Sequence, residues 1–171
     1  MTIGDQEGSF LALVHANDSA IRKICRVYGD DRAAREDLYQ NILVQLWRAL
    51  PSFRGTSAPG TWLYRVALNT ALAQRRRASA RPETQLEDPD TFMGEHHHRP
   101  DREFEANQRL EKLYRAIDRL DDLDKALILL HLEDQSYREI AEVLDISESN
   151  VGVKLHRIRK KLATLLIEER P

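Results

Sequence analysis

The clearest chemical pattern in the chain is a basic segment near its C-terminus. Residues 150–162 contain five Lys and Arg residues and no Asp or Glu. Apolar residues recur there at helical spacing, so they share one side of a helix and leave the opposite side polar. Asn pairs with adenine, Arg with guanine and a Val methyl with thymine in a major groove, while flanking bases contact phosphates. This pattern favours DNA recognition over a solvated charged helix, and the residues concerned are Ser149, Asn150, Val153, Lys154, His156, Arg157, Lys160 and Lys161.

The residues before this segment predict the turn that would present it. Ser136 and Glu139 have the spacing of a capping box and open a short helix with Ile140 facing inward. Asp145 is suited to the left-handed conformation of a tight turn, and Ser147 is suited to cap the next helix. A short helix, a turn and a longer helix together make a helix-turn-helix.

Three amphipathic helices are expected in the N-terminal part of the chain. Apolar residues at spacings of three, four and seven predict the first one, and Gly29 stands where a left-handed residue would end it. Asp30 or Asp31 can cap the second helix, and Thr61 can cap the third. The predicted ranges are about residues 8–28, from Asp30 or Asp31 to Pro51, and from Thr61 to the Arg75-Arg76-Arg77 run.

The middle of the chain differs in composition from both ends. Residues 83–105 carry 2 basic and 8 acidic residues, whereas residues 1–82 carry 12 basic and 7 acidic residues. Pro, Asp, Glu, Arg and His without periodicity predict an acidic, flexible linker over residues 79–104. Because this acidic connector separates two basic surfaces, the charge pattern suggests two contacts with a polyanion.

The C-terminal part has the pattern of further helices and, like the rest of the chain, no strand pattern. Apolar periodicity predicts helices around residues 110–120 and 123–130, followed by the helix-turn-helix within residues 135–166. The predicted fold is therefore all-α, with two small helical domains joined by a flexible linker. The domains are expected at residues 1–78 and 105–171, and the C-terminal one is a four-helix domain.

Composition narrows the classes of protein further. The chain has 171 residues, of which 42% are hydrophobic and 32% are charged, as in one or two globular domains. Neither a leader pattern nor a membrane-spanning run is present, so a cytoplasmic protein is expected. Cys25, the lone cysteine, is expected to be buried. No catalytic motif stands out, and His96-His97-His98 lacks a fixed fourth ligand for a metal ion. We therefore expect that the protein is not an enzyme and binds no metal, cofactor or small-molecule substrate.

Four strings of residues carry a family pattern when they are taken together. They are Asp37-Leu38-Tyr39-Gln40-Asn41 with Leu46-Trp47-Arg48, Phe53-Arg54-Gly55, Thr61-Trp62-Leu63-Tyr64-Arg65-Val66-Ala67-Leu68-Asn69, and Tyr137-Arg138-Glu139-Ile140-Ala141 with Val151 to Leu162. In this order they resemble the extracytoplasmic-function (ECF) group of bacterial sigma factors. The resemblance implies an alternative sigma factor that binds core RNA polymerase and directs promoter-specific initiation of transcription, including promoter opening.

The resemblance implies that the first domain recognises and melts the proximal promoter element. The loop from Ser52 to Gly60 would hold an extruded nontemplate base, for which an aromatic face and hydrogen-bond donors are chemically suited. The alternatives to DNA contact are core packing for Trp62, a plain surface amide for Asn69 and a basic helix terminus for the three consecutive arginines. The implied DNA contacts are Ser52, Phe53, Arg54, Thr56, Trp62, Arg65, Asn69, Arg75, Arg76 and Arg77.

The resemblance also implies a polymerase contact on the second helix. This contact would lie on the coiled coil of the largest polymerase subunit, with core packing as the alternative for Leu46 and Trp47. Asn41 departs from the Glu that is usual in the group. The acidic linker would follow the RNA exit path of the polymerase or act as a solvated tether. The implied polymerase contacts are Asp37, Gln40, Asn41 and Arg48.

The last helix would, by the same resemblance, read the distal promoter element about 70 Å from the first contact. Gly152 weakens this helix relative to Ala, and a close approach of the helix backbone to DNA is one reason for a glycine at this position. An anti-sigma factor is a further implied partner. The alternative is a stand-alone helix-turn-helix regulator, which the stretch from Phe53 to Asn69 disfavours because such a regulator has no use for a melting loop.

Overall fold

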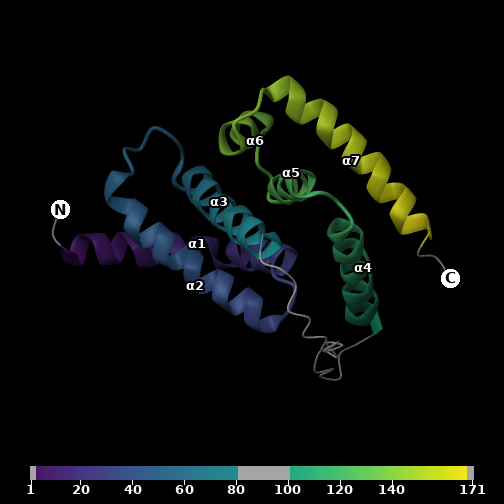
Figure 1. The fold of residues 1–171 in the computed structure, drawn as a ribbon, viewed down its shortest axis with the longest axis horizontal. Coiled ribbons are helices and arrows are strands. Elements are labelled where there is room, and N and C mark those ends of the chain that lie inside the picture. Colours follow the sequence, from purple (N-terminus) through teal and green to yellow (C-terminus); the bar gives the residue numbers. More distant parts are fainter. Residues whose placement is uncertain (1–2, 81–100, 169–171) are drawn as a thin grey trace.

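The computed structural model describes residues 3–80 and 101–168, and all regular secondary structure within these ranges is helical (Figure 1). The predicted all-α fold, with a helix-turn-helix in a four-helix C-terminal domain, is confirmed. The N-terminal domain consists of α1 (Ile3–Tyr28), α2 (Arg32–Ala49), the short 3-10 helix η1 (Leu50–Ser52) and α3 (Pro59–Ser79). The C-terminal domain consists of α4 (Asp101–Asp118), α5 (Asp122–Leu132), α6 (Tyr137–Leu144) and α7 (Glu148–Glu168).

Helices α1 and α4 begin at least five residues earlier than the sequence pattern predicted. Helix α1 starts at Ile3 instead of residue 8, and α4 starts at Asp101, within the predicted linker. Both extensions are mostly polar, so hydrophobic periodicity gave no sign of them. Of the predicted linker, residues 81–100 lie outside the described residues, and this range includes His96-His97-His98.

Side-chain caps fix the starts of the helices that the sequence located correctly. The Asp31 carboxylate accepts a hydrogen bond from the Ala34 backbone N–H at 2.7 Å, at the N-terminus of α2. The capping box of α6 is complete, because Ser136 Oγ accepts from the Glu139 N–H at 3.2 Å and the Glu139 carboxylate accepts from the Ser136 N–H at 2.8 Å. Asp145 ends α6 in the left-handed conformation, with φ of 54°.

Two other local predictions were wrong. Gly29 is not left-handed, since Gly55 is the glycine with positive φ among the described residues. A Cβ at Gly29 would instead lie 2.6 Å from Arg35 Cγ, so glycine is needed there for close packing. Thr61 does not cap α3, which begins at Pro59, because the fixed φ of proline suits the first turn. Thr61 is buried in the first turn of that helix.

The apolar stripe of α7 packs inward as its spacing predicted. Val151, Leu155, Ile158 and Leu162 are all buried, which leaves the opposite side of the helix to solvent. Cys25 is also buried, with 4% of its surface exposed. Burial raises the pKa of its thiol to about 11, so Cys25 stays protonated at neutral pH.

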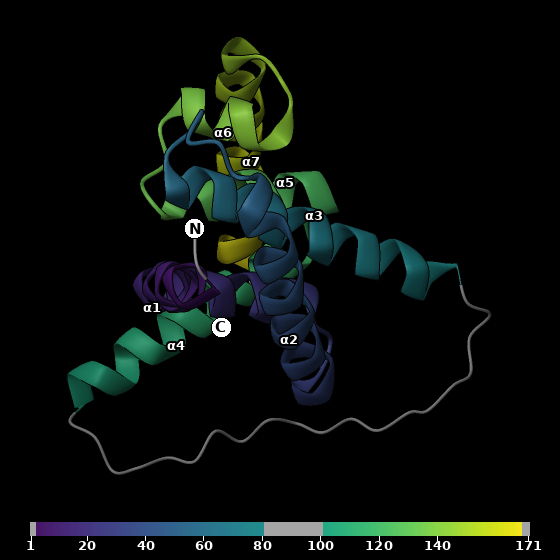
Figure 2. The same cartoon turned by 90° about the vertical axis from the view of Figure 1, so that its left-hand side faces the viewer.

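The two domains pack against each other, which the sequence did not predict. In Figures 1 and 2 the C-terminal domain lies along α3 and α1, with α6 next to α3 and α7 on the outer side. Ile24, Tyr64 and Leu68 of the N-terminal domain surround a small cavity together with Leu129 and Leu130 of α5. The apolar core is therefore continuous across the domain boundary.

The Ser136→Ala variant should destabilise the protein by about 1 kcal/mol, because it removes the cap of α6. Hydrogen bonds from the Ser136 hydroxyl and N–H hold the pKa of Glu139 below its usual value. This contribution is present above the unfolded-state pKa and is lost as the pH falls through the folded-state pKa. The difference from wild type in the free energy of unfolding should therefore shrink in acid.

Urea unfolding at neutral and acidic pH measures this effect, with Ser19→Ala at an exposed position inside α1 as the control. An equal effect of both variants would contradict the capping role.

Candidate nucleic-acid interfaces

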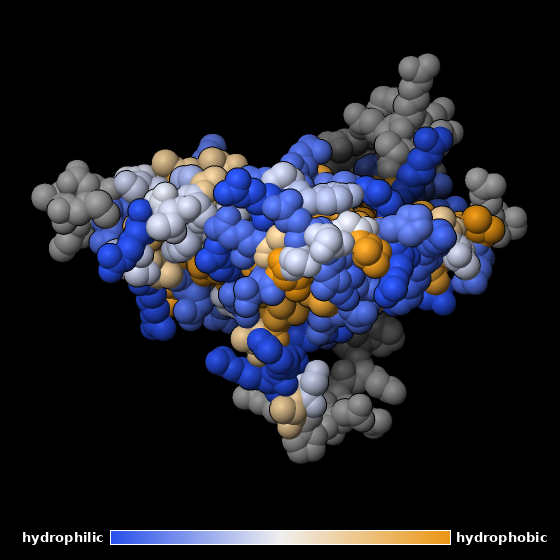
Figure 3. Space-filling view, turned by 90° about the horizontal axis from the view of Figure 1, so that it is seen from above, coloured by the Kyte–Doolittle hydropathy of each residue, from blue (hydrophilic) through white to orange (hydrophobic). Residues whose placement is uncertain are grey.

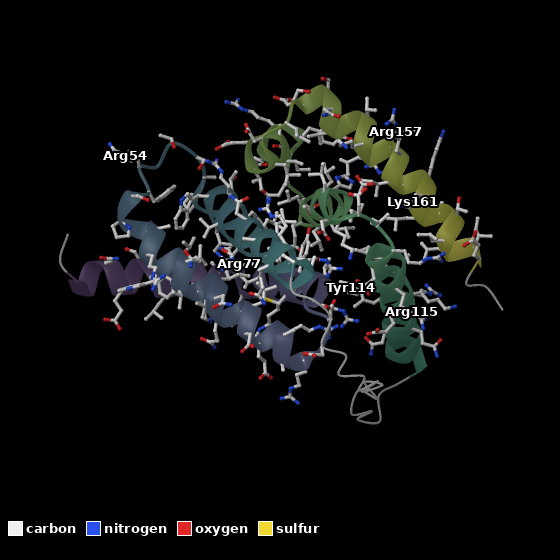
Figure 4. The ribbon with its side chains drawn as sticks, viewed as in Figure 1. Arg54, Arg77, Tyr114, Arg115, Arg157 and Lys161 are labelled. Carbon is white, nitrogen blue, oxygen red and sulfur yellow. The ribbon has the colours of Figure 1, made fainter. Side chains whose placement is uncertain are left out.

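The outer face of α7 carries the residues predicted to read the distal element. Val153 is 52% exposed at the middle of this face, and Arg157 and Lys161 are exposed on the same helix (Figure 4). Lys154 is half-buried at the edge of the face. The Ser147 hydroxyl accepts from the Asn150 N–H at 3.2 Å, so the predicted cap of α7 is present. The exposed members of the predicted set are Ser149, Asn150, Val153, His156, Arg157, Lys160 and Lys161.

Gly152 has a packing partner that the sequence did not reveal. A Cβ at this position would lie 3.4 Å from Cε2 of the Tyr137 ring on α6, which is ordinary contact. The glycine therefore lies under an aromatic ring of its own domain. Because this contact leaves room for a methyl group, packing against Tyr137 does not by itself require glycine at residue 152.

The Gly152→Ala variant should be more stable than wild type by up to about 1 kcal/mol, because Ala favours a helix and its methyl fits beneath Tyr137. Thermal unfolding measures the gain, and promoter affinity should stay unchanged. A loss of affinity without a loss of stability would instead favour the close approach of this backbone to DNA.

The loop between α2 and α3 presents an aromatic pair beside exposed polar side chains. The centroids of the Phe53 and Trp62 rings lie 5.1 Å apart, at an interplanar angle of 41°, and both side chains are half-buried. Arg54 extends from the loop into solvent (Figure 4), and Thr56 is also exposed. The Ser52 hydroxyl donates to the Ala49 carbonyl at 2.7 Å. The loop thus offers an aromatic surface with polar groups around it.

The predicted DNA contacts on α3 fall into two groups. Asn69, Arg76 and Arg77 are exposed, whereas Arg65 and Arg75 are half-buried against the C-terminal domain. Arg65 and Arg75 pair there with the acidic side chains of Glu142 and Asp122, respectively. The structure therefore leaves only part of the predicted α3 surface open. Seen from above the view of Figure 1, the surface is mostly hydrophilic, with hydrophobic residues gathered near its middle (Figure 3).

A groove of about 710 Å³ runs between α2 and α3. It brings the predicted polymerase contact Asn41 beside the predicted DNA contacts Asn69 and Arg77. Asn41 donates a hydrogen bond to the Gln74 side chain across the groove at 3.0 Å. The other polar groups on its walls have no common pattern in the sequence, because they come together only when the two helices pack. These polar residues are Gln45, Thr70 and Gln74.

The exposed side of α2 carries the other predicted polymerase contacts. Spacings of three, four and four place Asp37, Gln40, Val44 and Arg48 on one stripe of this helix, and Val44 is 44% exposed. Leu46 and Trp47 had two alternatives, core packing or a polymerase contact, and the structure separates the two residues. Leu46 is fully buried, whereas Trp47 is 37% exposed and meets the Phe10 ring edge-on. Val44 was missed because an apolar residue in a helix is usually assigned to the core.

Neither a membrane span nor a metal cluster is found in the described ranges. Within residues 3–80 and 101–168, no helix combines the length and apolar character needed to cross a bilayer. The same residues contain no group of three or more His, Cys, Asp or Glu side chains that could hold a metal ion.

Both halves of the chain match protein-family models. The model for sigma-70 region 2 matches residues 13–81, and the model for sigma-70 region 4 matches residues 110–162. A chain with both regions in this order is a sigma-type transcription initiation factor, and the protein belongs to the sigma-70 family. The stand-alone regulator is not favoured, because the region 2 match accounts for the N-terminal domain.

Curated relatives narrow the assignment within this family. The chain is 31% identical to the RNA polymerase sigma-H factor of Pseudomonas aeruginosa over 167 residues, which cover 93% of this chain and 86% of that protein. It is 33% identical to the ECF RNA polymerase sigma-E factor of Escherichia coli K12 over 134 residues, which cover 74% and 70%. The protein is thus an alternative sigma factor of the ECF type that directs transcription.

Solved structures share the fold. One is CnrH in complex with the cytosolic domain of CnrY, with a TM-score of 0.69 and 23% identity over 96% of this chain and 91% of that chain. Another is the sigma factor RpoE in complex with the anti-sigma factor NepR from Bartonella quintana, with a TM-score of 0.66 and 20% identity over 98% and 100%. At these identities the likeness establishes the fold alone.

Proposed function

We propose that the protein binds core RNA polymerase through the exposed stripe of α2 and contacts promoter DNA at two places. The loop before α3 and the exposed part of α3 recognise and melt the proximal element, and the outer face of α7 reads the distal element. The observation that carries the proposal is the agreement between the two matched sigma regions and the two exposed polar surfaces. The chain then acts as an initiation factor without catalysis of its own, in the cytoplasm.

The polymerase contact is supported by the composition of the α2 stripe. Asp37 and Arg48 carry opposite charges at its two ends, and the Val44 side chain lies between them. An apolar centre with a charged rim is typical of protein interfaces. The stripe also stays exposed while the two domains pack together.

The proximal DNA contact is supported by the Phe53–Trp62 pair. A melted base needs an aromatic face to replace the stacking that it loses, and such stacking contributes about 1 to 3 kcal/mol per base. Phe53 provides that face from a loop, and Arg54 and Thr56 provide polar groups next to it. Arg76 and Arg77 at the end of α3 then bind phosphates.

An anti-sigma factor is included among the proposed partners. The solved structures of RpoE and CnrH both contain a second protein, which for RpoE is an anti-sigma factor. In this chain such a partner would compete with core polymerase for the exposed α2 stripe.

The Val44→Asp variant should lower the affinity for core polymerase about tenfold, because it places an unpaired charge at the centre of the interface. The matched control is Leu132→Asp, since Leu132 is similarly exposed at 49% but lies on α5. Titration of labelled protein with core polymerase compares the two. Equal affinities of both variants would contradict the use of the α2 stripe.

A further inference from the structure

A hydrogen bond to a histidine of α5 holds one of the exposed bases of α7. Arg159 Nη2 lies 2.7 Å from Nε2 of His131, which stands in the last turn of α5. An arginine side chain has only N–H donors, so the imidazole nitrogen accepts this hydrogen bond. Arg159 is exposed, whereas His131 is half-buried. The bond therefore fixes the direction of an exposed guanidinium from a neighbouring helix.

Arg159 lies on the flank of α7 opposite Lys161. Two residues correspond to about 200° around a helix, whereas residues seven apart lie on nearly the same side. Lys154 and Lys161 therefore share one flank, and Gly152 and Arg159 share the other. The outer face, with Val153 at its middle, lies between the two flanks. Both edges of the proposed reading face thus carry basic residues.

The two flanks have different neighbours on α5, which packs against α7. Burial raises the pKa of Asp124 in the first turn of α5, whereas the nearby Lys154 and Lys161 act in the opposite direction. These two lysines therefore share an acidic neighbour at one end of α5. At the other end of α5, Arg159 has an imidazole as its neighbour.

The imidazole leaves the positive charge of Arg159 uncompensated. Arg26 and Arg65 pair with carboxylates, which offset the charge of their guanidinium groups. An imidazole nitrogen that accepts a hydrogen bond belongs to an uncharged ring, since both nitrogens of a charged ring are donors. The bond uses one of the five N–H donors of a guanidinium, and a bidentate phosphate contact needs two. Arg159 is thus oriented without losing its attraction for an anion.

We infer that Arg159 binds a phosphate of the DNA duplex and that His131 is the positioning residue that holds it there. This phosphate lies across the major groove from the one that Lys161 contacts. The inference rests on the proposed function, because only an α7 that enters the major groove brings both flanks to phosphates. A side chain that is already held loses less freedom when it binds, which favours the contact.

The first test measures binding of the full chain to a fluorescent duplex of mixed sequence at several salt concentrations. Arg159→Ala should bind this duplex more weakly than wild type, because it loses one phosphate contact. A fourfold rise in salt should lower the affinity of wild type about three- to fourfold more than that of the variant. Equal salt dependence of the two proteins would overturn the phosphate contact.

Arg119→Ala is the matched control for this test. It removes the same charge from an exposed position of the same domain, where Arg119 pairs with Glu168. Its salt dependence should equal that of wild type. A decrease as large as that in Arg159→Ala would show an effect of net charge alone and would overturn the contact.

The second test asks whether His131 acts through Arg159. His131→Leu should weaken duplex binding about two- to tenfold, which corresponds to the cost of ordering one long side chain. The same substitution should have no effect in the Arg159→Ala background, because there is then no side chain to position. His131→Gln keeps an acceptor and should retain the affinity of wild type. Titrations at about pH 8 keep a protonated imidazole from contributing.

An equal loss from His131→Leu in both backgrounds would overturn the positioning role, since a purely structural effect does not require Arg159. Lys161→Ala distinguishes a failure of this inference from a failure of the proposed function. If Lys161→Ala weakens duplex binding and Arg159→Ala does not, the inference is wrong and the α7 assignment stands. If neither variant weakens binding, the α7 assignment is wrong as well.

Discussion

The Arg157→Ala variant is expected to bind the distal promoter element about 1 to 3 kcal/mol less tightly and to lose discrimination at one base position. Arg157 lies on the outer face of α7, opposite the buried stripe that fixes the orientation of this helix. From that position its guanidinium can make two hydrogen bonds to one guanine in the major groove. Fluorescence anisotropy on the distal duplex and on its single-base variants measures both effects.

Lys161→Ala is the matched control for this prediction. Lys161 is exposed on the same helix, toward the flank of the reading face. Its loss should weaken all sequences alike and reduce the salt dependence of binding by about one phosphate contact. If both variants gave the same sequence profile, the assignment of base-reading and phosphate-binding sides on α7 would be wrong.

The Phe53→Ala variant is expected to reduce promoter opening more than about tenfold, while binding of the distal duplex stays near that of wild type. The Phe53 ring packs on Trp62 in the loop before α3, where it can replace the stacking of an extruded base. Permanganate reactivity of unpaired thymines in the complex with polymerase measures the opening.

A conservative substitution separates base capture from loop stability in this experiment. Phe53→Tyr keeps an aromatic face beside Trp62 and should therefore retain opening. Reactivity that is unchanged in Phe53→Ala would remove base capture from this residue.

Local patterns predicted much of the fold because local forces determine those features. Asp31 and Ser136 begin helices through hydrogen bonds within three residues, and Asp145 ends one through its own backbone conformation. The inward stripe of α7 follows from helical periodicity alone. The sequence alone therefore predicted which side of α7 is polar.

Features that depend on distant parts of the chain could not be predicted from local sequence patterns. Gly29 follows the end of α1 as predicted, but it is not left-handed, and the close approach of Arg35 Cγ is what leaves no room for a side chain there. Arg65 and Arg75 were predicted to contact DNA, yet Glu142 and Asp122, which pair with them, lie in the other domain. Their pairing depends on how the two domains pack, and no spacing within α3 encodes it. For the same reason the groove between α2 and α3 had no signature in the sequence.

The most direct test of the sigma-factor account is transcription of genomic DNA from the source organism by its core RNA polymerase, with and without this protein. The account predicts new transcript 5′ ends that appear only with the protein and share two upstream sequence elements about two helical turns apart. The Val44→Asp variant should produce fewer of these ends, and Leu132→Asp should produce as many as wild type. An identical set of 5′ ends with and without the protein would contradict the account.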